Sequence, residues 1–209
     1  MSDAQTAPPA TRAMAGIVGA GQLARMTLQS AIALDVSVRL LADRADDGAA
    51  KIWRDVLVGA PNDLDAVRSL AARCDVVTFD HELVPHAILT TLEAEGFVLR
   101  PSAATLALAQ DKQKQRESHA ALGLPVPPFQ ISHDPNAVPA FAKVHGWPVV
   151  AKLARGGYDG RGVWVLRHEQ DVADFAAEIA GRDTPLVLEP FISIEQELAI
   201  LVARRPNGE

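Results

Sequence analysis

The chain has 209 residues, of which 48% are hydrophobic and 22% are charged, and its formal net charge is −6. This composition is typical of a globular protein with a sizeable core, arranged as one large or two small domains. A negative balance without a block of lysine and arginine argues against nucleic acid as the main partner, since phosphate backbones are bound by concentrated basic surfaces. The single cysteine, Cys74, excludes an internal disulfide framework and favours a reducing compartment.

Neither a membrane helix nor a secretory signal is predicted. No stretch approaches the ~18 uninterrupted apolar residues of a membrane helix. Residues 1–13 lack a basic start followed by an apolar centre. We therefore expect a disordered lead-in over 1–13 and a cytoplasmic protein.

From residue 15 onward, short apolar runs alternate with helical patterns. This alternation is typical of a parallel sheet with crossover helices, so it predicts an α/β fold. Asn62 is the predicted N-cap of one helix, and Gly96 is the predicted stop of another. In this first part, strands are predicted at 15–18, 36–41, 56–58, 76–79 and 97–102, and helices at 22–34, 63–72 and 84–96.

The character of the sequence changes after Pro101. Ser102 is the predicted N-cap of one long polar helix, which Gly123 stops, and the prolines that follow force an extended exit. We expect domains at 14–109 and 110–209. In the second part, helices are predicted at 102–122, 137–145 and 171–180, and strands at 149–153, 163–166, 186–189 and 197–203. The dipeptide Asn207-Gly208 is a strong hairpin signal without a following strand, so we expect a truncated chain.

Gly19 and Gly21 lie between a predicted strand and a predicted helix, in "GIVGAGQLARM". Bare amides and the positive end of the helix dipole can hold an anion there. Asp43 follows where a dinucleotide-binding fold keeps the acid that binds ribose. These residues fit a nicotinamide-dependent oxidoreductase, and a tight turn without any ligand is the alternative.

A second glycine-rich loop lies in "AKLARGGYDGRGVWVL", residues 151–166. Its glycine amides can face phosphate oxygens, while Lys152 and Arg161 supply positive charge. It is not a P-loop, because in a P-loop the lysine follows the glycines and a helix comes next, whereas here a strand follows. The alternatives are a glycine-rich hairpin loop, and a role for Lys152 as a solubilising residue on an edge strand.

Acidic residues follow in "LVLEPFISIEQELAILV". Glu189 ends a predicted strand, where a carboxylate can accept both hydroxyls of a ribose, and the backbone after it can reach the edge of an adenine. Glu195 is assigned to a solvated face, and this reading remains an alternative for Glu197. Lys112 lies in "QDKQKQRE", a charge run that would ordinarily be a solvated helix face. The six histidines show no metal-ligand spacing, and no motif of nucleophilic catalysis is present.

Together these motifs resemble the ATP-grasp superfamily and, within it, the ribonucleotide carboxylases of purine biosynthesis. The similarity covers nearly everything after residue 14, in the family's order. It implies a Rossmann-like pre-ATP-grasp domain followed by an incomplete α+β ATP-grasp domain. The segments that carry it are "GAGQLARM" at 19–26, "TFDHELVP" at 78–85, "QDKQKQ" at 110–115, "GLPVPPF" at 123–129, "AKLARGGYDGRG" at 151–162 and "LEPFISIEQEL" at 188–198.

The resemblance implies a carbon–nitrogen ligase that carboxylates the exocyclic amine of 5-aminoimidazole ribonucleotide. ATP would activate bicarbonate as carboxyphosphate, with release of ADP and phosphate. The family also implies magnesium, with ligands expected beyond residue 209, and a homodimer at full length. We therefore expect the 209-residue chain itself to be inactive. A non-catalytic nucleotide-binding fragment and an NAD-dependent oxidoreductase are the alternative functions.

The resemblance also assigns roles to individual residues. The family commonly shows T-x-E-x-E where this chain has Thr78, Asp80 and Glu82, so Glu82 fits the pattern and Asp80 departs from it. The implied catalytic residues are Tyr158, Asp159 and Arg161, and the implied ribonucleotide-binding residues are Gly19, Gly21, Gln22 and Glu82. The implied ATP-binding residues are the lysines Lys112 and Lys152, the loop residues Gly157, Tyr158, Asp159, Gly160, Arg161, Gly162 and Val163, the linker residues Glu189, Pro190, Phe191 and Ile192, and Glu197.

Overall fold

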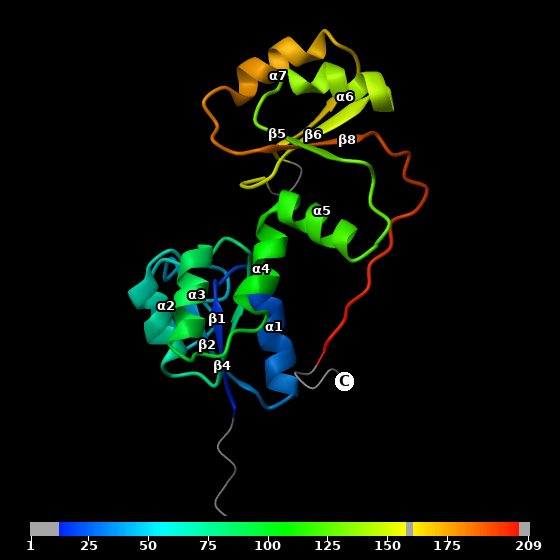
Figure 1. The fold of residues 1–209 in the computed structure, drawn as a ribbon. Helices are drawn as coiled ribbons and strands as arrows, with labels where there is room; N and C mark the ends of the chain where they lie inside the picture. The colour runs from blue at the N-terminus through cyan, green and yellow to red at the C-terminus, as the bar shows by residue number, and fades with distance from the viewer. Residues whose placement is uncertain (1–12, 158–160, 205–209) are drawn as a thin grey trace, which may run out of the picture. The chain divides into compact units, whose positions relative to one another are not determined.

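The computed structural model describes residues 13–157 and 161–204 (Figure 1). Of the residues singled out above, Tyr158, Asp159, Gly160 and the dipeptide Asn207-Gly208 lie outside these ranges. The chain divides into two compact units, Met1–Gln115 and Arg116–Glu209.

The first unit is built on a four-stranded parallel sheet in the order β3-β2-β1-β4. One hydrophobic cluster joins Ile17 and Leu40 of the sheet to Leu28 of helix α1, and a second joins Val18 to residues of α2, α3 and α4 on the other face. Helices therefore cover both faces of the sheet, which confirms the predicted α/β class. The elements are β1 Met14–Val18, α1 Gln22–Ala33, β2 Ser37–Ala42, β3 Val56–Val58, α2 Leu64–Ala71, β4 Val76–Phe79, α3 His86–Ala94 and α4 Ala103–Gln110.

The second unit contains a four-stranded antiparallel sheet in the order β5-β8-β6-β7. Helices α6 and α7 pack on one face of it (Figure 1). In β6, alternate residues Val149, Ala151 and Leu153 are buried against these helices, so Val150 and Lys152 point to the opposite face. The elements are α5 Lys112–Ala121, whose first four residues belong to the first unit, β5 Gln130–Ser132, α6 Ala137–His145, β6 Val149–Leu153, β7 Val163–Leu166, α7 Asp171–Ile179 and β8 Leu186–Pro190.

The prediction of one long polar helix over 102–122 is wrong, because the chain forms two helices that meet at Asp111. This residue has extended backbone angles, φ −135° and ψ 108°, which end α4. Asp111 is 4% exposed, and its carboxylate accepts hydrogen bonds from the amides of Gln113 and Lys114, at 2.9 and 3.2 Å. Asp111 therefore starts α5 as an N-cap, and a capping side chain is a stronger boundary than the polar pattern around it.

Two expected strands are also absent from the described part of the chain. At 97–102 only a single parallel bridge forms, between Val77 and Leu99, because Pro101 has no amide hydrogen and α4 begins directly afterwards. At 197–203 the chain is exposed and has no regular structure, and no described segment pairs with it. An isolated strand is not stable in water. In contrast, the strand β5 forms where only an extended exit was expected.

The N-cap of α2 provides a test of the local structure. Asp63, and not the expected Asn62, accepts hydrogen bonds from the amides of Asp65 and Ala66. Asp63→Ala should lower the free energy of unfolding by about 1 kcal/mol, whereas Asn62→Ala should change it by less than about 0.5 kcal/mol. Urea denaturation of both variants measures the difference. Equal losses, or a larger loss for Asn62→Ala, would contradict this assignment.

Candidate functional site

The second unit places three charged side chains together on the sheet face that points away from α6 and α7. Val150 of β6 lies directly opposite Glu189 of β8, so Lys152, two residues further on, is the diagonal neighbour of Glu189 on the same face. The ammonium of Lys152 donates to one carboxylate oxygen of Glu189. The guanidinium of Arg116, in α5, donates through Nε to the other oxygen. We call Arg116, Lys152 and Glu189 the charged triad.

Glu189 is the most buried member of the charged triad, with 3% of its surface exposed. Burial by itself raises the pKa of a carboxyl group, but the hydrogen bonds from Arg116 and then Lys152 outweigh it and hold the pKa of Glu189 below its ordinary value. The carboxylate is therefore ionised at neutral pH. The side chains of Arg116 and Lys152 are 21% and 23% exposed, so both cations also face solvent.

The lowered pKa of Glu189 makes a prediction about acid stability. A carboxyl group with a pKa that is lower in the folded state stabilises the fold above its unfolded pKa, about 4.3, and the stabilisation is lost as the pH falls through the folded value. Urea denaturation between about pH 3 and pH 6 should show a shallower acid loss in Glu189→Gln than in the unaltered chain. Glu169→Gln, at an exposed position, is the control. An unchanged slope in Glu189→Gln would contradict the assignment.

The glycine-rich loop begins and ends beside Lys152. In the β6–β7 pair Lys152 lies opposite Val163, and the amide of Leu153 donates to the carbonyl of Gly162 at 2.9 Å. Gly156 and Gly162 have φ values of +75° and +72°, which side chains disfavour. Both ends of the loop therefore lie close to the charged triad along the strand. Gly157 and Arg161 flank the residues outside the described ranges, and Arg161 is exposed.

The predicted adenine linker follows directly from Glu189. The amide of Phe191 donates to the carbonyl of Pro148 at 3.0 Å, which ties the linker to the start of β6. Pro190 is half-buried, whereas Phe191 and Ile192 are 48% and 51% exposed. Glu197 lies further along in the exposed segment without regular structure, so its side chain is not brought to the charged triad by a strand.

Lys112 and Glu82 belong to the first unit, where Gln110 fixes the loop that contains Glu82. Its side-chain amide donates to the carbonyls of Glu82 and Val84, at 2.7 and 2.6 Å. Two of the motifs quoted above, "QDKQKQ" and "TFDHELVP", are therefore held together. Lys112 opens α5 and is half-buried, one helical turn before Arg116, so the two residues share a helix face.

The turn that contains Gly19 and Gly21 already holds an anion, which is the carboxylate of Asp80. The amides of Gly21 and Ala24 donate to its two oxygens, at 2.6 and 2.7 Å, at the N-terminus of α1. The amide of Gly19 donates to the carbonyl of Leu41 at 2.8 Å. The expectation that free amides of Gly19 and Gly21 await an anionic ligand therefore needs correction, because an internal carboxylate and a carbonyl already accept from them.

A cavity of about 220 Å³ opens beside this turn, at the carboxyl ends of the parallel strands. Gly19 and Gly21 line it together with three carboxylates, those of Asp43, Asp47 and Asp80. An acidic wall repels phosphate, so this cavity does not suit the pyrophosphate of a nicotinamide dinucleotide. Gln22 starts α1 as an exposed residue and does not line the cavity.

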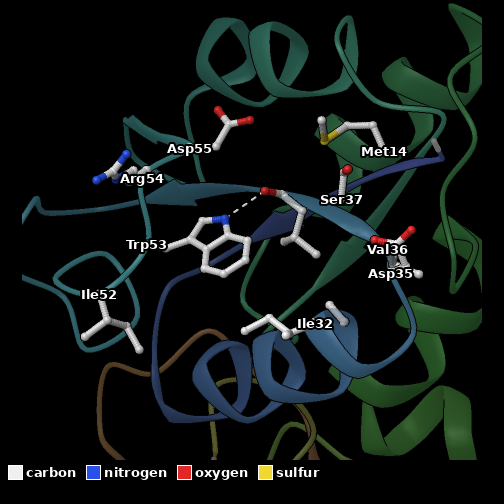
Figure 2. A pocket seen from close by; sticks show the side chains of 11 residues that line it. Met14, Ile32, Asp35, Val36, Ser37, Ile52, Trp53, Arg54 and Asp55 are labelled. Carbon is white, nitrogen blue, oxygen red and sulfur yellow. Dashed lines mark hydrogen bonds between the residues drawn. The ribbon is translucent and has the colours of Figure 1, made fainter. Parts of the chain in front are cut away.

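A larger cavity, of about 610 Å³, lies at the amino ends of the strands of the same sheet (Figure 2). Met14 and Ser37, at the amino ends of β1 and β2, line it with Ile32 and Trp53, and the Trp53 indole donates to the carbonyl of Val38 at 2.8 Å. None of the residues predicted above to bind or react lines this cavity. Ligands of open α/β sheets bind outside the carboxyl ends of the strands, so we do not place the site here.

The absence of a side chain at Gly21 allows the carboxylate of Asp80 to approach the backbone amide of Gly21. A double-mutant cycle can test this contact. A Cβ on Gly21 would lie 2.7 Å from Oδ2 of Asp80 and has no other close neighbour outside that carboxylate. Gly21→Ala should therefore cost about 1 kcal/mol of unfolding free energy, the value of an N-cap. In an Asp80→Ala background the same change should cost less than about 0.5 kcal/mol. Thermal or urea denaturation measures the cycle, and strict additivity would contradict it.

Within residues 13–157 and 161–204, no group of three or more histidine, cysteine, aspartate or glutamate side chains gathers in a way that could hold a metal ion. Among the described helices, none has the length and apolar character needed to cross a membrane.

Sequence reasoning missed Arg116 and gave no role to Asp80. Arg116 is the last cation of "QDKQKQRE", and its position four residues after Lys112 on one helix face was the signal available. For Asp80, the signal was an acid directly after an apolar strand whose neighbouring strand runs into a glycine turn. Neither pattern names the partner of the side chain, which lies 73 residues away for Arg116 and 59 for Asp80.

Comparison with known proteins identifies the class. A family model of the ribonucleotide synthetase pre-ATP-grasp domain matches residues 13–110, and a model of the ATP-grasp domain matches residues 117–209. The chain belongs to the ATP-grasp superfamily and carries a pre-ATP-grasp domain of the ribonucleotide synthetase type. Within that class, it is a homologue of the N5-carboxyaminoimidazole ribonucleotide synthases.

The relatives are matched over almost all of this chain. The N5-carboxyaminoimidazole ribonucleotide synthase of Mycobacterium tuberculosis is 44% identical over 196 residues, which are 94% of this chain and 46% of that protein. The crystal structure of the synthetase from Thermotoga maritima matches with a TM-score of 0.78 and 31% identity, over 94% of this chain and 51% of that one. The synthase of Aspergillus clavatus, in complex with ADP and 5-aminoimidazole ribonucleotide, matches with a TM-score of 0.76 and 26% identity, over 88% and 48% of the two chains. The chain spans about half the length of the curated relatives it matches.

Proposed function

We propose that this chain forms the ribonucleotide-side domain and the first part of the ATP-binding domain of an N5-carboxyaminoimidazole ribonucleotide synthase. The reaction is the carboxylation of 5-aminoimidazole ribonucleotide with ATP and bicarbonate, releasing ADP and phosphate. The observation that carries the proposal is the charged triad. Lys152, held on this sheet face by a buried carboxylate beside a glycine-rich loop, forms a preorganised place for phosphate oxygens. Similarity to a synthase solved with ADP and 5-aminoimidazole ribonucleotide supports it.

In this proposal Lys152 contacts the ATP phosphates, and Glu189 with Pro190, Phe191 and Ile192 borders the adenine. Lys112 and Glu197 are the further nucleotide contacts, and Gly19, Gly21, Gln22 and Glu82 face the ribonucleotide. Tyr158, Asp159 and Arg161 are proposed for the reacting groups.

Magnesium belongs to the proposal as the ion that would balance charge on the ATP phosphates. The residues of the described ranges do not by themselves assemble a metal site, so no step is assigned to a magnesium ligand among them. A homodimer is proposed for the full-length enzyme by the same family resemblance.

Separate calorimetric titrations with ATP and with NADH distinguish this proposal from an oxidoreductase. We expect ATP to bind and NADH not to bind, and the reverse result would overturn the proposal. A phosphate-release assay with ATP, bicarbonate and 5-aminoimidazole ribonucleotide, each omitted in turn, separates an enzyme from a non-catalytic nucleotide-binding module. Release that depends on both bicarbonate and the ribonucleotide is the result expected of the full-length enzyme.

Lys152→Ala should weaken ATP binding by about 1.5 to 3 kcal/mol, the range for a hydrogen bond to a charged group. Lys152→Arg should not restore binding, because a planar guanidinium does not replace a compact ammonium in a narrow site. Lys143→Ala, at an exposed position of α6 in the same unit, is the matched control. Calorimetry with ATP measures all three variants, and unchanged affinity in Lys152→Ala would remove Lys152 from the site.

A further inference from the structure

The charged triad brings two cations, Arg116 and Lys152, to one buried carboxylate. Its two cations share one carboxylate, Arg116 through Oε1 and Lys152 through Oε2 of Glu189, so the triad carries a net charge of +1. Glu189 is 3% exposed, and little water can replace either cation around it. Removing one partner of a buried ion pair is strongly destabilising, because it leaves the other charge buried without compensation.

Lys152 has two possible anionic partners, Glu189 and a nucleotide phosphate. In the proposed function its ammonium contacts a nucleotide phosphate, and in the structure it contacts Glu189. If Lys152 were the only cation on Glu189, turning toward a phosphate would leave that carboxylate without an ion pair. The second cation, Arg116, holds the other oxygen from α5, an element that does not belong to the sheet.

We propose that Arg116 is a positioning residue that retains Glu189 and thereby releases Lys152 for the nucleotide phosphate. This inference rests on the proposed function and adds a residue that acts through Glu189, without itself contacting the nucleotide. A guanidinium suits this role because it stays charged in partly buried surroundings and is less strongly hydrated than an ammonium. Both residues pair with the same carboxylate, but Arg116 holds Glu189 whereas Lys152 contacts the phosphate.

The test is a set of calorimetric titrations with ADP and with adenosine, which lacks phosphates. The variants are Arg116→Met, Glu189→Gln and the double variant, with Arg167→Met as the matched control at an exposed position of the same unit. Arg116→Met should weaken ADP binding by about ten- to a hundredfold, because Lys152 stays on Glu189. Adenosine binding should change by less than about threefold, since no phosphate contact is involved.

The double variant decides between a role through Glu189 and a direct contact. Once Glu189→Gln has removed the buried charge, Lys152 no longer has to neutralise it, so adding Arg116→Met should leave ADP affinity as in Glu189→Gln alone. A further loss of ADP affinity would mean that Arg116 contacts the phosphates itself, and would overturn the inference. Equal weakening of ADP and adenosine in Arg116→Met would also overturn it, because that result indicates a general structural role.

Two outcomes separate this inference from the proposed function. Unchanged ADP affinity in Arg116→Met, with ADP binding to the unaltered chain, would overturn the inference alone. Absence of ADP binding to the unaltered chain would overturn the proposed function and this inference with it. If circular dichroism shows that Arg116→Met does not fold, the comparison of the double variant with Glu189→Gln still decides, since neither of these has a buried carboxylate at position 189.

Discussion

The proposed nucleotide site depends on one buried carboxylate, Glu189, and on the two cations that keep it ionised. A buried acid in an apolar sheet would be neutral if it had no partners, and here burial is outweighed by hydrogen bonds from Arg116 and Lys152. Because Glu189 lies in β8 and Lys152 in β6, the antiparallel register of these strands fixes the distance between the charges. The same strand that carries Lys152 then enters the glycine-rich loop, so loop and charge are positioned by one hydrogen-bonded ladder.

A second carboxylate, Asp80, organises the first unit in a comparable way. It accepts from two amides at the N-terminus of α1, a place where a helix stabilises negative charge. A glycine turn at this position in an α/β fold is commonly interpreted as a ligand site. Here the glycines serve an internal contact, since a side chain at Gly19 or Gly21 would collide with Asp80. The acidic cavity beside the turn favours hydroxyl or amine groups over phosphate.

Both carboxylates illustrate how a charged side chain can join segments that lie far apart in the sequence. Asp80 and Glu189 each follow or end a strand, and each is paired with groups distant in sequence. Neither carboxylate belongs to an exposed ion pair, which would contribute little to stability, because Glu189 is buried and Asp80 accepts hydrogen bonds from backbone amides.

The sequence by itself determined the α/β class, the positions of most strands and helices, and the glycine-rich loop with its preceding lysine. These features are local: apolar periodicity, glycines and prolines act within a few residues. Only the tertiary structure decided that Asp111 divides the polar helix, that 197–203 forms no strand, that Asp80 fills the turn at Gly21, and that Arg116 shares Glu189 with Lys152. Each of these depends on a partner residue or strand brought in by folding, or on the lack of one among the described residues. A side chain's own sequence neighbourhood does not encode that partner.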